Sequence, residues 1–552
     1  MRVAWQWILK FDRAAHHRIA VALAVATFGL GLTYATTVAG GSDSYGYISQ
    51  ADLWIRGDLK TDQTWAQNVP WPLANWTFAP LGYHPSERPR ERWVLTPTYS
   101  PGLPLLMAAA KLIGGQEAVY WVVPIMGALL VLATYGIGCR LASPTAGLIG
   151  AWLVATSPAV LFELMAPMTD VPVAAAWAVS FYFLLGNTAP AAALAGLAAA
   201  VAVLIRPNLA FGAIVIASWY ALRLWRADAG TRRREFWLGA AFFAGVLPGI
   251  AVVALINNSL NGSPWRSGYG SIGYLFALGN FWPNARQYAE WLIDSQTPIV
   301  VAGLAAIVVP LKRLWPAARD RAVFVVINGF VIGIWVMYCF FQRSDVWWYL
   351  RFLLASWPFL MLGVGAVVVA LTRPAPPTLQ VIATTLVIAL GVYEMKVAAD
   401  RNVFDLWKQD RHYVSVARLA RSMTEPNSVI VSMLYSGSVR YYGGRVTLRF
   451  DLLDERWLDR AVSWLTERGV HTYLLANESE MTQVRARFSG QQTLQKLEEP
   501  PVFVYQGPAT VRLYDLSRSG ESVSAHAPLV IVETYKGLRS MPPVPLRHPT
   551  FD

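Results

Sequence analysis

Two carboxylates and two guanidinium groups stand at the ends of long apolar runs in this sequence. The carboxylates are those of Asp43 and Asp170, and the guanidinium groups are those of Arg206 and Arg351. A carboxylate can take a proton from a hydroxyl group, and guanidinium groups can stabilise a departing phosphate. If the fold brings these side chains to one face, they predict an acid–base site that also binds an anion.

Asp43 is the first carboxylate that follows the first apolar run, and we take it as the candidate general base. An amphipathic helix is predicted directly after it, over residues 45–56, and is expected to lie in the membrane interface. Asp43 could therefore be the N-cap of that helix, a position that Asp favours. Both roles can belong to one side chain, so both stay open.

Asp170 stands between two apolar runs, just before Pro172. Because Pro is frequent in the first turn of a helix, Asp170 could also be a helix cap. Glu163 precedes it in the same stretch and is a lower-ranked second carboxylate. Two carboxylates on one face favour a functional role for Asp43 and Asp170 over capping alone.

Arg206 ends one apolar run and Arg351 opens another, after Trp347, Trp348 and Tyr349. An arginine at a membrane boundary commonly extends its charged group towards water, which is the alternative to a binding role. Short external turns seldom carry arginine, however, and guanidinium can contact a phosphate at two places. Both roles therefore stay open, and we take both arginines as candidate phosphate ligands.

Three further site candidates rank lower, namely Tyr99, His84 and Arg343. The seven histidines are scattered and predict no metal centre, although a single cation bound by carboxylates stays an open alternative. The two cysteines, Cys139 and Cys339, lie inside apolar runs and are expected to act as small hydrophobic residues.

The composition predicts the elements that must position these residues. Of the 552 residues, 55% are hydrophobic and only 14% are charged, whereas soluble domains average about 25% charged. One large soluble enzyme is therefore excluded, and the sequence indicates a polytopic α-helical membrane protein. The net charge of +12 is explained by membrane orientation, and nucleic acid is not an expected partner.

About eleven spans are predicted. Placing the N-terminus in the cytoplasm puts the arginine-rich stretches around 223–234 and 312–321 on the cytoplasmic side. The first span is expected to stay as an anchor, since no cleavage site follows it. The apolar runs are residues 19–39, 117–139, 146–163, 172–187, 190–205, 208–225, 236–256, 298–311, 322–341, 351–371 and 379–397.

This topology predicts a membrane domain over residues 1–398, with outer loops at 40–116 and 257–297. The second loop is expected to form an interfacial lid. Helices and strands then alternate over 399–535, which predicts an extracytoplasmic α/β domain. The last residues, 536–552, are rich in proline and are expected to be disordered. The candidate site residues all fall on the outer face.

An enzyme at the outer leaflet needs a lipid-carried donor, because soluble nucleotide donors are kept in the cytoplasm. A polyprenyl-phosphate sugar would need a base, cations for the phosphate and an apolar groove for the lipid. The rival hypothesis is a transporter or flippase, in which charges line a path through the membrane. A third is a scaffold protein. The candidate charges at one face and the lack of an inverted repeat favour the transferase.

Three runs carry a resemblance to a known family, the GT-C glycosyltransferases. The chain looks like their bacterial family 39 and family 83 branches, the protein O-mannosyltransferases and aminoarabinose transferases. The resemblance implies that Asp43 is the base, that Asp170 shares its site, and that Arg206 and Arg351 face the lipid phosphate. The runs are Gly41-Ser42-Asp43-Ser44-Tyr45-Gly46-Tyr47, Tyr99-Ser100-Pro101-Gly102-Leu103-Pro104 and Thr169-Asp170-Val171-Pro172.

The chain departs from the mannosyltransferases at Ser44, where they carry Glu after the Asp. A protein acceptor is therefore not implied, and the C-terminal domain is more similar to the α/β cap of the aminoarabinose branch. The expected activity is inverting transfer of a hexose or pentose from a polyprenyl phosphate to an acceptor hydroxyl. The expected location is a bacterial inner membrane, and the acceptor is a glycan, lipid or protein of the cell envelope.

Overall fold

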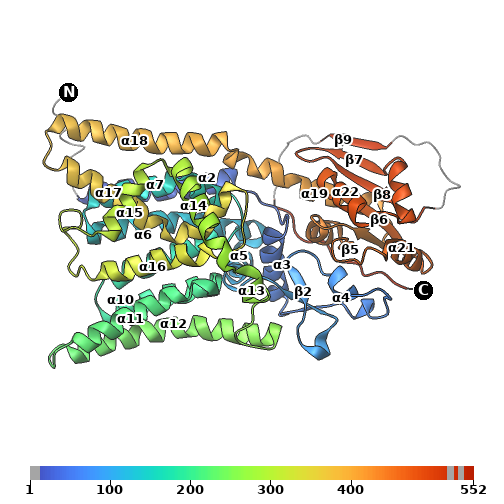
Figure 1. Ribbon diagram of the computed structural model, residues 1–552, viewed down its shortest axis with the longest axis horizontal. Coiled ribbons are helices and arrows are strands. Elements are labelled where there is room, and N and C mark those ends of the chain that lie inside the picture. The colour runs from blue at the N-terminus through green and yellow to red at the C-terminus, as the bar shows by residue number, and fades with distance from the viewer. Residues whose placement is uncertain (1–12, 519–527, 533–539, 552) are drawn as a thin grey trace.

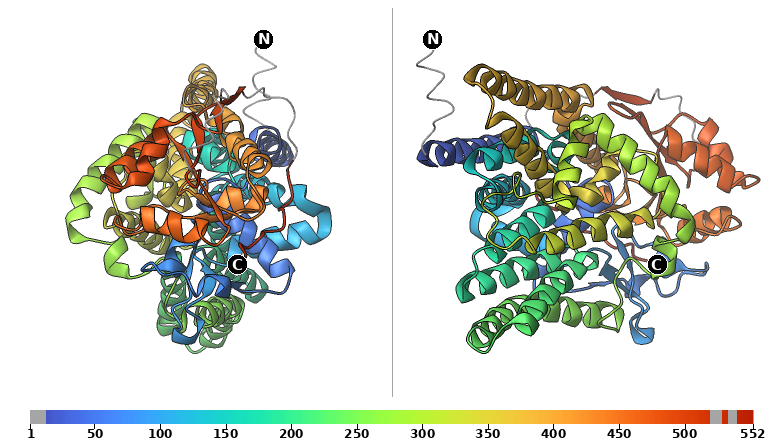
Figure 2. Two further views of the ribbon diagram at one scale, coloured as in Figure 1. Left: turned by 90° about the vertical axis from the view of Figure 1, so that its right-hand side faces the viewer. Right: turned by 60° about the vertical axis from the view of Figure 1, so that its left-hand side comes forward.

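The computed structural model describes residues 13–518, 528–532 and 540–551. A bundle of helices forms one part of the molecule and a sheet with flanking helices forms the other (Figure 1). In the views of Figure 2, the sheet region lies over one end of the bundle. The first outer loop runs between these two parts (Figure 1).

The bundle consists of helices whose apolar residues are spread around the whole circumference, as expected for helices in lipid or in a protein interior. They are α2 (Arg13–Tyr34), α6 (Val122–Leu141), α7 (Pro144–Thr156), α8 (Pro158–Leu164), α9 (Asp170–Leu184), α10 (Ala189–Ile205), α11 (Phe211–Arg226), α12 (Arg232–Asn261), α15 (Ile299–Val308), α16 (Val323–Cys339), α17 (Trp357–Thr372) and α18 (Pro377–Asp400).

Six helical segments among the described residues are long and apolar enough to cross a membrane, and eight if two bent pairs each count as one span. The bent pairs are α7 with α8, at 58°, and the segment Leu278–Gln296 with α15, at 118°. Helices α9, α10 and α16 are apolar but shorter. The count of eleven spans and their orientation stay predictions.

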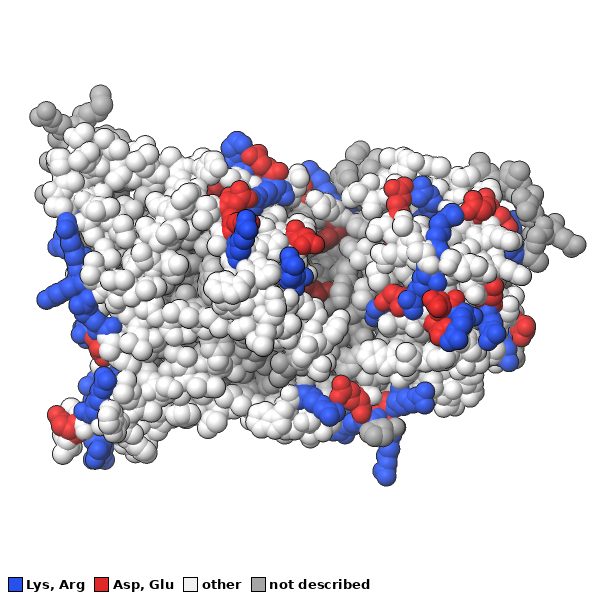
Figure 3. Space-filling view, in the orientation of Figure 1, with Lys and Arg blue, Asp and Glu red and all other residues white. Residues whose placement is uncertain are grey.

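Charge is distributed unevenly over the surface. Figure 3 shows Lys and Arg gathered at the left-hand end, and a broad band almost without charge between that end and the middle of the molecule. The arginines at the α11–α12 connection, including Arg226 and Arg233, belong to an exposed segment. An uncharged band beside a basic end is typical of a protein embedded in a bilayer.

Small residues let the central helices approach closely. A Cβ atom at Gly196 of α10 would lie 2.2 Å from the carbonyl oxygen of Phe242 in α12, and one at Gly245 would lie 2.4 Å from that of Ala193. Helices in membranes associate through such contacts because lipid gives them no hydrophobic reason to pair. This packing holds α10 in place, and α10 carries Arg206 at its end.

The first outer loop contains helix α3 (Asp43–Ile55), the short strands β1 (Thr61–Asp62), β2 (Tyr83–Pro85) and β3 (Val94–Pro97), and helices α4 (Ala74–Thr77) and α5 (Gly102–Ala118). The strands form a small antiparallel sheet in the order β1-β3-β2. The expected interfacial helix exists as α3, but most of its residues are buried. Its polar side is covered because Asp52 is paired with Lys111 of α5 and Tyr441 of the C-terminal region.

The second outer loop contains α13 (Ile272–Leu275), η5 (Leu278–Asn280) and α14 (Phe281–Gln296). This loop has several exposed aromatic residues, among them Trp265, Tyr274 and Trp282. Such side chains are typical of the membrane–water boundary. A role of this loop as a lid stays a prediction.

The C-terminal region is an α/β fold, as the alternating pattern predicted. Its six strands have the order β5-β4-β6-β8-β7-β9, with β4 parallel to β5 and β6, β8 antiparallel to β6 and β7, and β9 parallel to β7. The elements are α19 (Leu406–Met423), β4 (Ser428–Val431), α20 (Ser436–Ser438), η8 (Val439–Gly443), β5 (Val446–Leu448), α21 (Leu458–Thr466), β6 (His471–Asn477), α22 (Glu478–Arg487), η9 (Gln492–Glu498), β7 (Phe503–Gln506), β8 (Val511–Asp515) and β9 (Leu529–Val532).

The proline-rich tail differs from the expectation of disorder over the residues that the structure describes, 540–551. The backbone N–H of Val544 donates to the carbonyl of Tyr441 at 2.8 Å, and that of Arg547 donates to Gly444 at 3.1 Å. The ring of Phe551 packs against Trp464 with centroids 5.1 Å apart. The composition predicted little to bury, but the described residues of the tail pack against the α/β region. Residues 536–539 and 552 lie outside the described part.

Candidate functional site

Asp43 is the first residue of α3 and is half-buried. Ser42 occupies the N-cap position, and no side chain caps this helix. The Asp43 carboxylate instead accepts a hydrogen bond of 2.6 Å from the hydroxyl of Tyr99, which also lies 2.6 Å from the hydroxyl of Ser42. The capping alternative is therefore wrong, and the carboxylate is held by Tyr99 from the end of the first outer loop.

Arg351 contacts the same carboxylate and comes from the segment just before α17. It belongs to η6 (Trp347–Ser356), and both of its terminal nitrogens lie 3.4 Å from Oδ2 of Asp43. Its guanidinium group also lies over the rings of Tyr349 and Phe352, 5.2 and 5.1 Å from their centroids. The aromatic rings fix the plane of the guanidinium group, so it meets the carboxylate with two N–H groups.

Asp170 and Arg206 form a second ion pair, 2.5 Å apart, in which the Asp170 carboxylate is fully buried. Nε of Arg206 also donates to the hydroxyl of Thr169 at 3.1 Å. Thr169, not Asp170, is the N-cap residue of α9, and its side chain makes no capping bond. Asp170 therefore binds an arginine where a helix cap was the alternative.

The two ion pairs belong to one cluster. The guanidinium groups of Arg206 and Arg351 both lie over the ring of Phe352, at 5.4 and 5.1 Å from its centroid. Tyr47, on the same face of α3 as Asp43, contacts both sides: its ring lies 4.7 Å from that of Tyr99, and its hydroxyl lies 3.5 Å from that of Thr169. The fold thus brings Asp43, Asp170, Arg206 and Arg351 to one site.

Glu163 also lies at this cluster, within electrostatic reach of Asp170 and Arg351. It is buried, and its carboxyl group lies within hydrogen-bonding reach of that of Asp170. Nε of Arg351 is buried without a hydrogen-bond partner among the described residues. Buried polar groups are normally hydrogen-bonded, so this nitrogen is available to a polar ligand.

Two of the lower-ranked residues do not join the cluster. His84 is buried between Thr96 and the carbonyl of Pro85, and burial lowers its pKa. Arg343 forms no ion pair within the described residues and lies in the loop before η6. Tyr99, the third of them, touches Asp43 directly.

Several residues of the cluster escaped prediction from the sequence. Tyr47 could have been found, because it stands one helical turn after Asp43 and so shares its face. Phe352 follows Arg351, yet nothing in its type marks it as a shared platform for two arginines. Tyr269 comes from the second outer loop, 5.9 Å from the ring of Tyr99, and no local signal predicted that contact.

The tyrosines around Asp43 stay protonated at neutral pH. Burial is the main reason why the pKa values of Tyr47, Tyr99 and Tyr269 are raised, and the negative charge of Asp43 raises them further. Each hydroxyl can therefore donate a hydrogen bond. Tyr99 uses its proton to hold Asp43 in place.

No group of three or more His, Cys, Asp and Glu side chains in the described ranges could hold a metal ion. Glu163 and Asp170 are two carboxylates, and Arg206 and Arg351 beside them already bring two positive charges.

Comparison with solved structures shows the fold of this chain. ArnT from Cupriavidus metallidurans in the apo state has a TM-score of 0.56 at 12% identity, covering 93% of this chain and 98% of that one. ArnT bound to undecaprenyl phosphate gives 0.55 at 12%, covering 92% and 98%. The oligosaccharyltransferase of Archaeoglobus fulgidus tethered to an acceptor peptide gives 0.55 at 14%, covering 93% and 75%.

The sequence itself matches no family model, and a search of curated proteins finds no match. At 12–14% identity, the structural similarity is evidence for the fold alone. The chain therefore has the fold of these neighbours, and this is the kind of fold that its resemblance to the GT-C glycosyltransferases implied.

Proposed function

From the GT-C fold, we propose that this chain is an inverting glycosyltransferase that moves a sugar from a polyprenyl phosphate to an acceptor hydroxyl. The observation that carries the proposal is the meeting of Asp43 with Arg351 beside the pair of Asp170 with Arg206. A base next to two phosphate-binding cations is the set of groups that this reaction needs.

In the proposed reaction, the Asp43 carboxylate takes the proton of the acceptor hydroxyl. The freed oxygen attacks the anomeric carbon of the donor sugar, and the bond between that carbon and the phosphate oxygen breaks. The electron pair of that bond leaves with the polyprenyl phosphate. One carboxylate suffices, because phosphate leaves without the protonation that a sugar alcohol needs in glycoside hydrolysis.

Arg351 and Arg206 would stabilise the charge that grows on the departing phosphate. Arg351 contacts Asp43 only at 3.4 Å, so its N–H groups can turn to a phosphate at small cost. Its buried Nε has no partner and is available to the same ligand. Arg206 is fixed by Asp170 and Thr169, which makes it the rigid member of the pair.

The neighbours support a lipid-linked donor. ArnT was crystallised with undecaprenyl phosphate, and the Archaeoglobus enzyme AglB was solved with an inhibitory peptide and a dolichol-phosphate, at a TM-score of 0.55 to this chain. For this chain we propose a polyprenyl-phosphate sugar, either hexose or pentose. The acceptor is a hydroxyl of an envelope glycan, lipid or protein.

We place the reaction at the outer face of a bacterial inner membrane, with the N-terminus in the cytoplasm and the α/β region outside. The basic end of the helical bundle in Figure 3 supports this orientation, because Lys and Arg accumulate on the cytoplasmic side.

The test is transfer from radiolabelled polyprenyl-phosphate sugars in membranes that contain the chain or its Asp43→Asn variant. The variant keeps the size and the polar contact to Tyr99 but cannot act as a base. We expect it to lose transfer by about a hundredfold or more while its expression stays normal. Label in product and release of lipid phosphate are both measured.

Full activity of Asp43→Asn would contradict the assignment of the base. If neither protein consumes donor across a panel of sugars while a lipid co-purifies with both, the transport hypothesis gains over the transferase. Asp62→Asn is the matched control, because Asp62 lies on an edge strand of the same loop and is exposed.

A further inference from the structure

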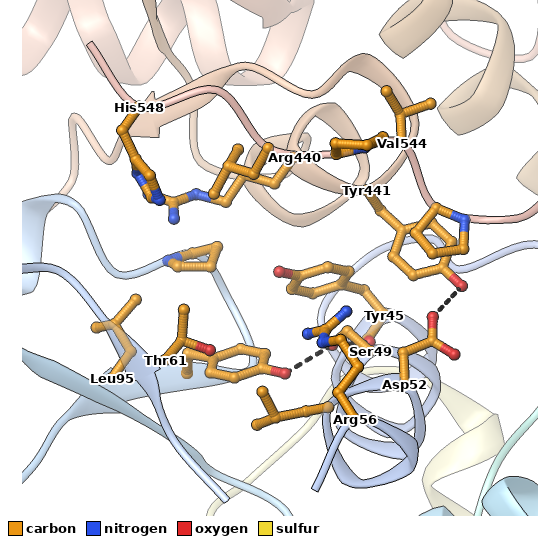
Figure 4. A pocket seen from close by; sticks show the side chains of 16 residues that line it. Tyr45, Ser49, Asp52, Arg56, Thr61, Leu95, Arg440, Tyr441, Val544 and His548 are labelled. Atoms are coloured by element: carbon orange, nitrogen blue, oxygen red, sulfur yellow. Dashed lines mark hydrogen bonds between the residues drawn. The ribbon is translucent and has the colours of Figure 1, made fainter. Parts of the chain in front are cut away.

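A cavity of about 410 Å³ lies behind the catalytic helix, between the first outer loop and the α/β region. Its volume falls within the range of small-molecule sites. Four parts of the chain line it: α3, the short strands of the first outer loop at Thr61 and Leu95, the turn at Arg440 and Tyr441, and the tail around Val544 and His548 (Figure 4). The reaction proposed above uses none of these residues.

Helix α3 separates this cavity from the candidate active site. Tyr45, Ser49, Asp52 and Arg56 are spaced by four, three and four residues, so they form one face of the helix, and all four line the cavity. Asp43 and Tyr47 belong to the other face, where Tyr99 packs. One helix therefore presents the proposed base on one side and the cavity on the other.

The cavity holds positive charge that no carboxylate neutralises. Arg440 is 7% exposed, and its N–H groups donate to Phe78 and Thr447 and to no acid in the described chain. Burial lowers the pKa of Arg440 to about 10, so it stays charged at neutral pH. Arg56, across the cavity in Figure 4, forms no ion pair among the described residues.

Asp52 has the one carboxylate among the lining residues, and this carboxylate already has partners within the protein. It is ion-paired with Lys111 and accepts a hydrogen bond of 2.8 Å from the hydroxyl of Tyr441. The balance of charge at the cavity is therefore positive, with Arg56 and Arg440 on opposite walls (Figure 4). An occupant with a negative group would be attracted from both sides.

The remaining lining fits a sugar ring. Tyr45 and Tyr83 both line the cavity, with ring centroids 5.8 Å apart, and the hydroxyl of Tyr83 lies 2.9 Å from that of Ser49. Aromatic faces bind the apolar C–H face of a sugar, and hydroxyl groups bind its edge.

The tail closes the cavity from outside. The backbone N–H of Val544 donates to the carbonyl of Tyr441, next to Arg440, and that of Arg547 donates to the carbonyl of Gly444. A Cβ atom at Gly444 would lie 2.7 Å from the carbonyl oxygen of Pro545. Gly444 has a φ of +63°, a conformation that suits glycine, so the turn accepts the tail at close range. His548 then stands beside Arg440 at the rim (Figure 4).

We propose that this cavity binds an anionic sugar unit, one that bears a phosphate or a carboxylate, in a part of the acceptor that does not react. That it is the acceptor rests on the proposed function. Binding energy from a remote part of a substrate can position the reacting group.

The test is direct binding of glucose 1-phosphate to the full chain purified in detergent, measured by isothermal titration calorimetry. Glucose and inorganic phosphate are the two comparison probes. We expect glucose 1-phosphate to bind more tightly than either. Equal binding of glucose would overturn the anionic character of the site, and equal binding of inorganic phosphate would overturn recognition of the sugar.

The variant Arg56→Glu reverses an exposed charge of the cavity and should lower the affinity for glucose 1-phosphate by about tenfold or more. Arg90→Glu is the matched control, because Arg90 is an exposed arginine of the same outer loop outside the cavity. Equal weakening by the two variants would overturn the inference, since it would reflect overall charge alone.

Two further variants separate this site from the donor site and from catalysis. Arg351→Ala should leave the affinity for glucose 1-phosphate unchanged, and a loss there would place the probe at the donor site and overturn the inference. Asp43→Asn should also bind as the parent chain does. If Asp43→Asn loses transfer while no protein binds the probe, the cavity inference fails and the proposed function stands.

Discussion

Arg351 makes contacts of several kinds at the candidate site. It approaches Asp43 with two nitrogens, keeps a third nitrogen buried without a partner, and lies over two aromatic rings. A flexible ammonium group could match the charge but not this planar arrangement. Substitutions at this position can therefore separate the effect of the planar guanidinium shape from the effect of the positive charge.

We expect Arg351→Ala to lower donor turnover by about a hundredfold, as removal of a group that stabilises developing negative charge does. Arg351→Lys should cost less, because the positive charge remains while the two-point contact is lost. Release of lipid phosphate from the labelled donor measures both. Equal rates for the two variants would argue against two-point contact with phosphate, and Arg343→Ala, in the exposed loop before η6, is the control.

Individual site residues could be predicted where a charge interrupts an apolar pattern. Asp170 and Arg206 stood out because charge at the end of a membrane helix is costly and needs a partner. Their partnership with each other, at 2.5 Å, depends on how α9 and α10 pack and had no local signal. Phe352 and Tyr269 were missed for the same reason, since an aromatic residue in an apolar segment resembles ordinary core.

At the scale of elements, α10 and α12 decide where Arg206 stands. Their backbones approach at Gly196 and Gly245, where added Cβ atoms would meet backbone oxygens of the opposite helix. The end of α10 must then lie at the depth where Arg206 meets Asp170.

We expect Gly196→Ala to lower the free energy of unfolding by about 1–3 kcal/mol, because the new methyl group cannot fit without separating the helices. Thermal unfolding of the detergent-purified chain measures this. Gly29→Ala in α2 is the matched control, since nothing lies within 4 Å of its added Cβ atom and Ala favours helix. Similar melting temperatures for Gly196→Ala and the parent chain would refute the close approach.

Sequence patterns predicted where helices and strands lie in the chain better than they predicted which side chains pack against them. In the C-terminal region the sequence pattern predicts helices over 405–423, 455–468 and 479–488 and strands over 428–433, 446–450 and 472–476. The helices α19, α21 and α22 and the strands β4, β5 and β6 lie close to these ranges, because alternation and turn residues are local signals. The strands β7, β8 and β9 were not predicted. Helix α3 was predicted, but its burial was not, because the partners of its polar side, Lys111 and Tyr441, are distant in the chain.

At the scale of the whole molecule, the α/β region contacts the start of α3, the helix that carries the proposed base. The hydroxyl of Tyr442 accepts a hydrogen bond of 2.7 Å from the backbone N–H of Ala39, a few residues before Asp43. A Cβ atom at Gly437 would lie 2.3 Å from the ring of Tyr45, so that turn is packed onto α3. The region that covers the site therefore also sets the position of its proposed base.

We expect Tyr442→Phe to test this coupling, because it removes one oxygen and leaves the buried N–H of Ala39 without an acceptor. The free energy of unfolding should fall by about 1–3 kcal/mol, the cost of an unsatisfied buried donor. Transfer should fall as well, since Asp43 would lose part of its support. Tyr393→Phe on the exposed face of α18 is the control. Unchanged stability and unchanged transfer in Tyr442→Phe would mean that the α/β region covers the site without positioning Asp43.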